Sequence, residues 1–310
     1  MNDNNTIPSF ASEDAIDLKE IFQTLWRKKV LIIVVNSAVV ILTAIATLMM
    51  PNVYRSETRM IPADESKGGG LAALASQFGG LASLAGINLS ENATDKSVVA
   101  LEILTSRAFI NKFIKERNIA VDLVAAKGWD RENDTLVIDS ELYNITTKEW
   151  VRDVSYPQSV TPSEFELYEE FREVFFVIND TSTGFVTLAM ESYSPTIAKQ
   201  WLELIVNDIN DYMRERDIAI AETSIEYLEE QVSKNTFKEM EPVFYQLIQE
   251  QIKTIMLAKS RKEYVFQVID PSFVPEEKHS PKRFLIVFLL AVFSSALSVV
   301  FVLMKYSNKS

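Results

Sequence analysis

The sequence has no cysteine and only one histidine, His279. The absence of cysteine excludes disulfides, thiol nucleophiles and cysteine-ligated zinc. A single imidazole also excludes a metal site built from two histidines of one chain. Aspartate and glutamate are plentiful, but on an acidic surface they mainly keep a protein solvated. No catalytic constellation stands out, so we expect a protein that is not an enzyme and that holds no cofactor and no metal.

Charge is absent from two long runs, residues 30–50 and residues 284–304. At 1.5 Å per residue each run makes a helix of about 31 Å, the thickness of the hydrocarbon layer of a bilayer. Core helices of this length rarely lack every charged residue. A cleaved signal peptide is the other alternative for the first run, because Ala44-Ile45-Ala46 is similar to a cleavage site. However, residues 1–29 are too long and too acidic for a signal n-region.

The charges around the first run predict its orientation. Three basic residues, 27–29, precede the run, and Arg55 and Arg59 follow it. This asymmetry favours a cytoplasmic N-terminus, whereas two basic residues on each side of the second run give no preference. We expect cytoplasmic tails at residues 1–29 and 305–310, transmembrane helices at 30–50 and 284–304, and one external domain at 51–283.

The external domain carries nearly all the acidity of the chain. Residues 51–283 contain 25 basic and 38 acidic residues, a formal charge of −13 against −12 for the whole chain. A field of this sign disfavours nucleic acid and anionic lipid headgroups as partners.

The second span has small residues spaced four apart. Ala291 with Ser295, and Ser294 with Ser298, form two small-xxx-small pairs. Such pairs permit close packing of transmembrane helices, but serine hydroxyls in such helices also bond back to their own backbone. These four residues are candidates for transmembrane packing.

The first half of the external domain mixes strand and helix patterns. Residues 66–90 are rich in Gly, Ala and Leu, and we interpret them as an apolar segment that rests on the bilayer surface or on a partner, with a flexible loop as the alternative. Residues 129–160 give no firm prediction. The other patterns predict a strand at 54–61, one amphipathic helix at 95–117, a short helix at 162–172 and a β-hairpin of 175–179 with 185–192.

The second half of the domain predicts a long helical hairpin over residues 194–262. Ser194 caps a helix that starts at Pro195 and has no Gly or Pro before Pro242, so it reaches residue 234 and is about 60 Å long. A second helix covers 242–262, and residues 263–270 are rich in strand-forming types. The fold class is therefore α+β: an α/β base beside the membrane with a protruding helical hairpin. The unequal helix lengths leave open how the second helix returns to the base.

A proline-rich strap, residues 271–283, leads into the second span. Pro271, Pro275 and Pro281 stiffen it toward the polyproline conformation, and Lys282 and Arg283 follow. These five residues are the candidate functional motif, because a stiff strap would fix the base at a set height above the membrane.

Several of these segments occur together in one known family. They are DLKEIFQTLWRKK at 17–29, VFYQLIQEQIKTIMLAKSRKEYVFQVIDP at 243–271, and VIDPSFVP with SPKR at 268–275 and 280–283. With them the chain resembles, from end to end, the Wzz polysaccharide chain-length determinants, or polysaccharide co-polymerases, of Gram-negative inner membranes. The second span departs from that pattern, because family members often carry glycines there and this one has none.

The resemblance implies a fold and a function. It implies a membrane-proximal α/β base, a long helical protrusion and ring-shaped homo-oligomers. It also implies that the ring works with a membrane polysaccharide polymerase and the growing lipid-linked glycan, setting the chain length of O-antigen in lipopolysaccharide. The expected location is the bacterial inner membrane, with the main domain in the periplasm.

Two other functions stay open. One is a co-polymerase for capsule or exopolysaccharide export that works with a separate tyrosine kinase, since residues 305–310 carry no nucleotide site. The other is a periplasmic adaptor or sensor, which would need lipoyl-type β-domains beside the hairpin or a cytoplasmic output domain.

Overall fold

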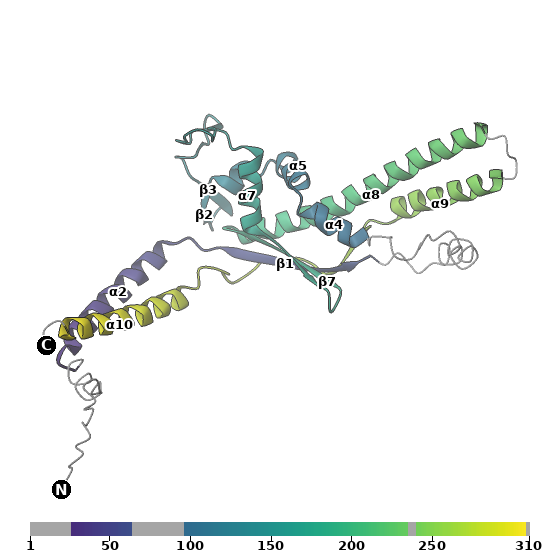
Figure 1. Cartoon of the computed structure of the whole chain (residues 1–310). Helices are drawn as coiled ribbons and strands as arrows, with labels where there is room; N and C mark the ends of the chain where they lie inside the picture. The colour runs from purple at the N-terminus through teal and green to yellow at the C-terminus, as the bar shows by residue number, and fades with distance from the viewer. Residues whose placement is uncertain (1–25, 64–95, 235–239, 308–310) are drawn as a thin grey trace, which may run out of the picture. The chain divides into compact units, whose positions relative to one another are not determined.

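The computed structural model describes residues 26–63, 96–234 and 240–307. The predicted apolar segment at 66–90 lies outside these residues. The chain divides into two compact units, Met1–Pro51 with Ser280–Ser310, and Asn52–His279. Figure 1 labels helices and strands of both units.

The first unit is a pair of apolar helices, α2 (Lys29–Met49) and α10 (Arg283–Ser307), packed against each other. Both are long and apolar enough to cross a membrane. Their bounds lie within a few residues of the predicted spans, because the run of uncharged residues fixes where such a helix ends.

The second unit is built on an antiparallel sheet with the strand order β6-β7-β1-β8. Its strands are β1 (Tyr54–Pro62), β6 (Phe175–Asp180), β7 (Phe185–Ser192) and β8 (Phe266–Asp270). The central strand β1 pairs with β7 from Tyr54 to Met60, but with β8 only from Arg59 to Pro62. Half of one edge of β1 is therefore left for another segment.

The hairpin of β6 and β7 confirms a sequence prediction. Its turn closes through the Gly184 N–H, which donates to Asp180 O at 2.8 Å, and Gly184 has a φ of 74°. A residue with a side chain would be strained there. The Asp180 carboxylate accepts bonds from the amide and the hydroxyl of Ser182 at 3.0 and 2.6 Å, which together with Thr183 lower the pKa of Asp180 to about 2.

The prediction of one helix over 95–117 is wrong. The chain instead forms α4 (Lys96–Leu104) and α5 (Arg107–Arg117). Ser106 has an extended backbone, and its hydroxyl accepts from Phe109 N at 3.3 Å as the N-cap of α5. A serine that caps a new helix competes with continuation of the old one. The break lets Leu104 and Phe109 both enter the core.

The predicted short helix is confirmed as α7 (Glu164–Val174), which begins with a reciprocal capping box between Ser163 and Glu166. The region without a firm prediction contains short elements: α6 (Ala120–Val124) and the strand pairs β2 (Ala126–Asp130) with β3 (Thr135–Ile138) and β4 (Tyr143–Asn144) with β5 (Glu149–Trp150).

The long hairpin consists of α8 (Pro195–Lys234) and α9 (Glu241–Ser260), which lie side by side (Figure 1). The predicted 40-residue helix is confirmed residue for residue. The structure also explains why α8 is longer than α9. The first half of α8 covers the sheet, and after α9 the chain meets α8 again near Arg214, whose guanidinium donates to Lys262 O at 3.4 Å. Only the second half of α8 therefore needs a partner helix.

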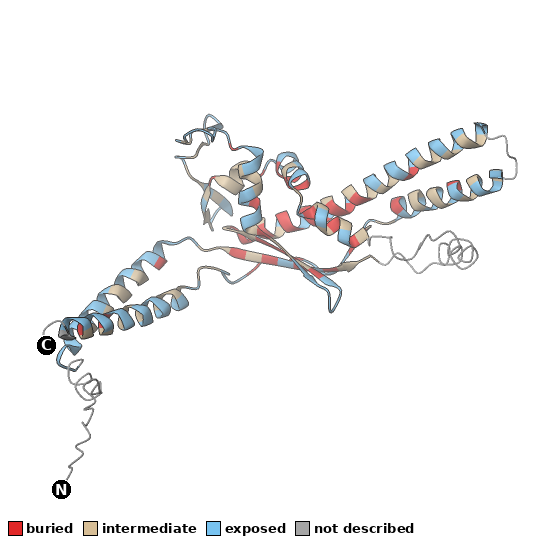
Figure 2. Ribbon diagram, viewed as in Figure 1, coloured by how far each residue is buried: buried red, intermediate tan, exposed pale blue. Residues whose placement is uncertain are grey.

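Burial follows this division. Figure 2 shows buried residues along β1 and the sheet-side half of α8, whereas the hairpin is mostly half-buried or exposed. Aromatic side chains from α5, α7 and β6 pack together in the core, Phe113 against Phe171 in a T-shaped contact and Phe171 against Phe175 in a tilted one. The largest fully buried side chains of the unit are Phe113, Phe171, Phe266, Met60, Leu104, Ile110, Ile114, Leu188, Met190, Leu202, Ile205 and Ile209.

Candidate functional site

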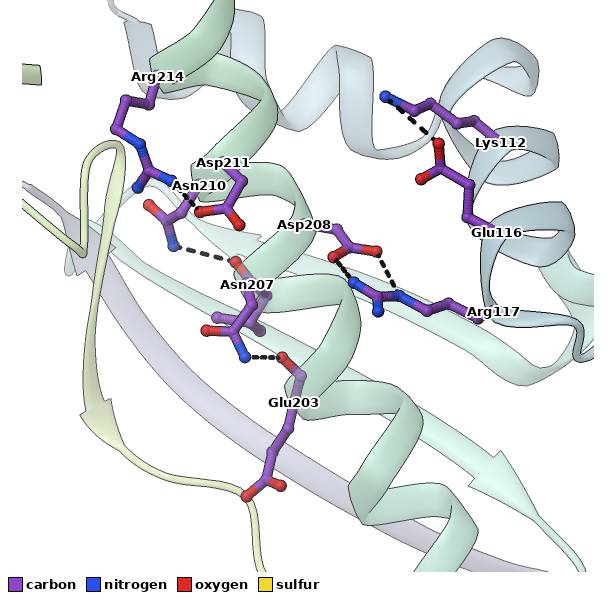
Figure 3. Close-up of polar contacts among 10 residues, drawn as sticks. Lys112, Glu116, Arg117, Glu203, Asn207, Asp208, Asn210, Asp211 and Arg214 are labelled. Atoms are coloured by element: carbon purple, nitrogen blue, oxygen red, sulfur yellow. Dashed lines mark hydrogen bonds and ion pairs between the residues drawn. The ribbon is translucent and has the colours of Figure 1, made fainter. Parts of the chain in front are cut away.

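The middle of α8 carries a run of polar residues where the sheet gives way to the hairpin. This α8 polar segment, residues 203–217, is drawn in part in Figure 3. Its side chains point in several directions around the helix, and different ones contact α5, β8 and the connection that follows α9. The segment joins elements that are far apart in the sequence.

Asn210 is the most buried polar residue of the α8 polar segment, at 4% exposure. Its side-chain oxygen accepts from the backbone N–H groups of Val265 and Phe266 at 2.8 and 3.0 Å. Its amide nitrogen donates to Val206 O at 3.0 Å. Because β8 forms the edge of the sheet, this one side chain satisfies two buried donors where that strand begins.

Asp208 and Asp217 anchor two further elements to α8. The Asp208 carboxylate accepts hydrogen bonds from two guanidinium nitrogens of Arg117 at the end of α5, from Nε at 3.1 Å and from Nη2 (Figure 3). This pairing raises the pKa of Arg117. Asp217 accepts from the Tyr264 hydroxyl at 2.7 Å and pairs with Lys96 Nζ at 3.0 Å. Burial and then the bond to Asp217 raise the pKa of Tyr264. The root of the hairpin is thus held by charge-assisted contacts.

The chain after β8 lies along the half of β1 that β8 leaves uncovered. Ser56 and Thr58 are buried, and their hydroxyls donate to the carbonyls of Phe273 at 2.7 Å and Asp270 at 2.8 Å. The His279 N–H donates to Val53 O at 2.8 Å. Prolines donate no ladder hydrogen bond, so the contact is made instead through backbone carbonyls of this segment, which accept from side-chain hydroxyls of the strand.

His279 has an ionic neighbourhood that the sequence did not reveal. Its Nε2 lies 3.5 Å from Glu191 Oε1 and 3.5 Å from Arg55 Nη1. Arg55 also pairs with Glu57 at 3.0 Å. These contacts tie the strap to β1 and β7, and they depend on strand pairing that no local pattern encodes.

The five residues of the candidate motif belong to two units, because the boundary between the units falls between His279 and Ser280. Pro271 and Pro275 belong to the second unit, where Pro275 is buried and Pro271 is exposed. Pro281, Lys282 and Arg283 belong to the first unit. The strap also bends at residues 276–277, so it is not one continuous extended rod.

Arg283 contacts the end of the first span. Its Nε donates to Thr47 O at 2.8 Å and its Nη2 to Met50 O at 2.9 Å. The last carbonyls of a helix have no partner within the helix. The guanidinium therefore caps α2 and joins the two spans at one end. Lys282 is exposed.

The four candidate packing residues of α10 separate into two faces. Ser294 donates to the side-chain oxygen of Asn36 on α2 and to Ala291 O, and Ser298, which is buried, donates to Ser294 O at 2.8 Å. The hydroxyls of these serines thus contact Asn36 of the other span and carbonyls of their own helix. Ala291 and Ser295 line a separate shallow groove on α10.

The part of the chain that the structure describes contains no cluster of metal-ligating side chains. Within residues 26–63, 96–234 and 240–307, no three His, Asp or Glu side chains stand close enough together to hold a metal ion. The polar groups described above hold elements of the fold together.

The architecture is that of an α+β protein with a helical hairpin and an apolar helix near each terminus, consistent with a two-pass inner-membrane protein. Residues 14–117 match the family described as "Chain length determinant protein", Wzz. The resemblance to the Wzz co-polymerases is thereby confirmed over about a third of the chain.

Other comparisons add little. No curated protein matches the sequence. Among solved structures, a full-length bacterial polysaccharide co-polymerase is similar with 12% identity and a TM-score of 0.34, covering 94% of this chain and 98% of that one. A fragment of WzzB, a polysaccharide co-polymerase from Salmonella Typhimurium, has 10% identity and a TM-score of 0.29, covering 74% and 100%. Because both TM-scores are low, the assignment depends on the family match.

Proposed function

We propose that this protein is a non-enzymatic regulator of polysaccharide chain length, of the O-antigen type found in lipopolysaccharide. The observation that carries the proposal is the match of residues 14–117 to the Wzz chain length determinants. The two apolar helices support anchoring in the inner membrane at both ends. In this proposal both tails are cytoplasmic and residues 51–283 form a periplasmic domain.

The protein acts as a ring-shaped homo-oligomer beside a membrane polysaccharide polymerase and its lipid-linked glycan. The hairpin supports self-association, because several apolar side chains of α9 remain 44–66% exposed. They are Val243, Leu247, Ile252 and Met256. Exposed apolar residues that recur along one element are typical of an interaction surface.

Deletion of the gene tests the regulatory role. The length distribution of the surface polysaccharide, resolved on a gel, should lose its modal band and regain it when the wild-type gene is restored. An unaltered ladder in the deletion strain would refute the proposal. A change confined to capsule or exopolysaccharide would instead favour the export branch of co-polymerases.

Two measurements test the arrangement. Alkaline phosphatase fused within residues 51–283 should be active, because that enzyme needs the periplasm, and activity only in fusions to the tails would contradict the topology. The full chain in lipid nanodiscs should run as one large assembly, and a monomer there would contradict the ring.

A further inference from the structure

Two adjoining cavities run along one side of the α8 polar segment. The first, of about 240 Å³, lies between α8, Thr58 of β1 and the start of the strap at Pro271 and Ser272. The second, of about 590 Å³, lies between α8, β8 and the connection that follows α9. Val206, Asn207 and Val268 line both, so the two cavities adjoin, and together they are called the α8 groove. Its size falls in the range of ligand clefts, roughly 300–1,000 Å³.

The charges that line the α8 groove balance. Arg261 and Lys262 stand against Glu203 and Glu263, two cations and two carboxylates. An anionic ligand would meet both carboxylates, and a cationic ligand would meet both basic groups. The net charge of −13 over residues 51–283 also disfavours polyanions. The groove therefore suits an uncharged ligand.

Other lining groups suit hydroxyls. The side-chain amides of Asn207 and Gln267 are exposed, and each can donate to and accept from a ligand, with one N–H of Asn207 already bonded to Glu203 O. A hydroxyl also donates and accepts, so an amide can meet it in either sense. Val206, Val268 and Pro271 supply apolar surface between the polar groups, as the C–H faces of a sugar ring require.

Ser272 adds an independent observation. It lines the smaller cavity at 9% exposure, and its hydroxyl oxygen is buried with no hydrogen-bond partner among the residues that the structure describes. A buried hydroxyl without a partner destabilises a fold. Its neighbour Phe273, by contrast, has its carbonyl bonded to Ser56. The Ser272 hydroxyl is therefore available to a ligand rather than used by the fold.

We infer that the α8 groove binds a short stretch of uncharged sugar residues of the growing polysaccharide. The inference rests on the proposed function, which supplies the glycan, and it adds the place where the glycan contacts the protein. Asn207 and Gln267 bind sugar hydroxyls along the groove, and Ser272 binds one at its strap end.

Ser272→Ala gives the sharpest test, because fold and ligand predict opposite effects. Loss of an unpaired hydroxyl should leave the melting temperature of the full chain unchanged or raise it. Loss of a hydrogen bond to sugar should weaken binding about five- to tenfold. Binding is measured by thermophoresis on the full chain in nanodiscs, with oligosaccharides released by mild acid from the strain's own surface polysaccharide. Wild-type affinity in Ser272→Ala and in Gln267→Ala would overturn the inference.

Cross-linking in cells tests the location directly. A photoreactive amino acid at Gln267 should yield a ladder of glycan-linked protein, which should be much weaker in the Ser272→Ala background. The same probe at Gln158, an exposed amide that lines neither cavity, is the matched control. Equal or absent ladders at both positions would overturn the groove assignment.

The groove inference and the proposed regulatory role can be refuted independently. If groove variants show wild-type affinity and wild-type modal length while gene deletion still alters the ladder, the groove inference is wrong and the regulatory role stands. If deletion leaves the ladder unchanged, the regulatory role itself is wrong.

Discussion

Replacement of Asn210 should destabilise the second unit by more than the loss of one hydrogen bond, because its side-chain oxygen accepts two. Asn210→Ala removes the acceptor of two backbone N–H groups, those of Val265 and Phe266, at 2.8 and 3.0 Å. Both residues are buried, at 4% and 0% exposure, so water does not readily replace the lost acceptor. Each unsatisfied buried donor costs about 1–3 kcal/mol, so the free energy of unfolding should fall by about 2–6 kcal/mol.

Asn207 supplies a matched control three residues earlier on the same helix. Its amide also donates to a carbonyl four residues back, Glu203 O at 2.8 Å (Figure 3), but the side chain is exposed. Water can replace that bond, so Asn207→Ala should change stability by no more than about 0.5 kcal/mol. The comparison isolates the two bonds to β8 from any general effect of losing an amide on α8.

The assay is thermal unfolding of the full chain in mild detergent, followed by circular dichroism. For a unit of this size 1 kcal/mol corresponds to about 2–4 °C, so Asn210→Ala should melt about 4–24 °C lower than wild type. Hydrogen exchange should also accelerate at Val265 and Phe266. The reasoning would be refuted if Asn210→Ala melted no lower than Asn207→Ala, or if exchange at those two amides stayed slow.

Three further perturbations follow from single contacts. Ser163→Ala removes the cap of α7 and should cost about 1 kcal/mol, seen as a lower melting temperature, and an unchanged one would show that the cap is dispensable. In this cysteine-free chain, Asn36→Cys with Ser294→Cys should cross-link under mild oxidation, whereas Asn36→Cys with Leu297→Cys should not, because Leu297 is exposed on the outer side of α10; equal cross-linking would contradict the packing of the spans. The lowered pKa of Asp180, about 2, means that its stabilisation is present above its ordinary pKa near 3.8 and is lost as pH falls through 2. Asp180→Asn should therefore lower the melting temperature at pH 5 but much less near pH 2, and a constant difference would contradict this assignment.

The sequence alone predicted the features that depend on interactions between residues close together in the chain. A run of uncharged residues defines each apolar helix, and Ser194-Pro195 with a long stretch free of Gly and Pro defines the 40 residues of α8. The hairpin of β6 and β7 follows from two β-rich runs around a turn that ends at Gly184. The one clear error, a single helix over 95–117, arose where two local signals compete. The apolar spacing continues through Ser106, but the cap that Ser106 forms interrupts the helix.

Tertiary structure alone decided which distant residues meet. The pairing of β1 with both β7 and β8 places the start of the strap beside Ser56 and Thr58. The proline motif is divided by the boundary between the two units. The return of the chain after α9 places Val265 against Asn210 and creates the α8 groove. These contacts join residues that lie more than 50 positions apart, so they depend on packing and strand order. No periodicity, cap or turn signal carries that information, because each of those describes only residues that are close together in the chain.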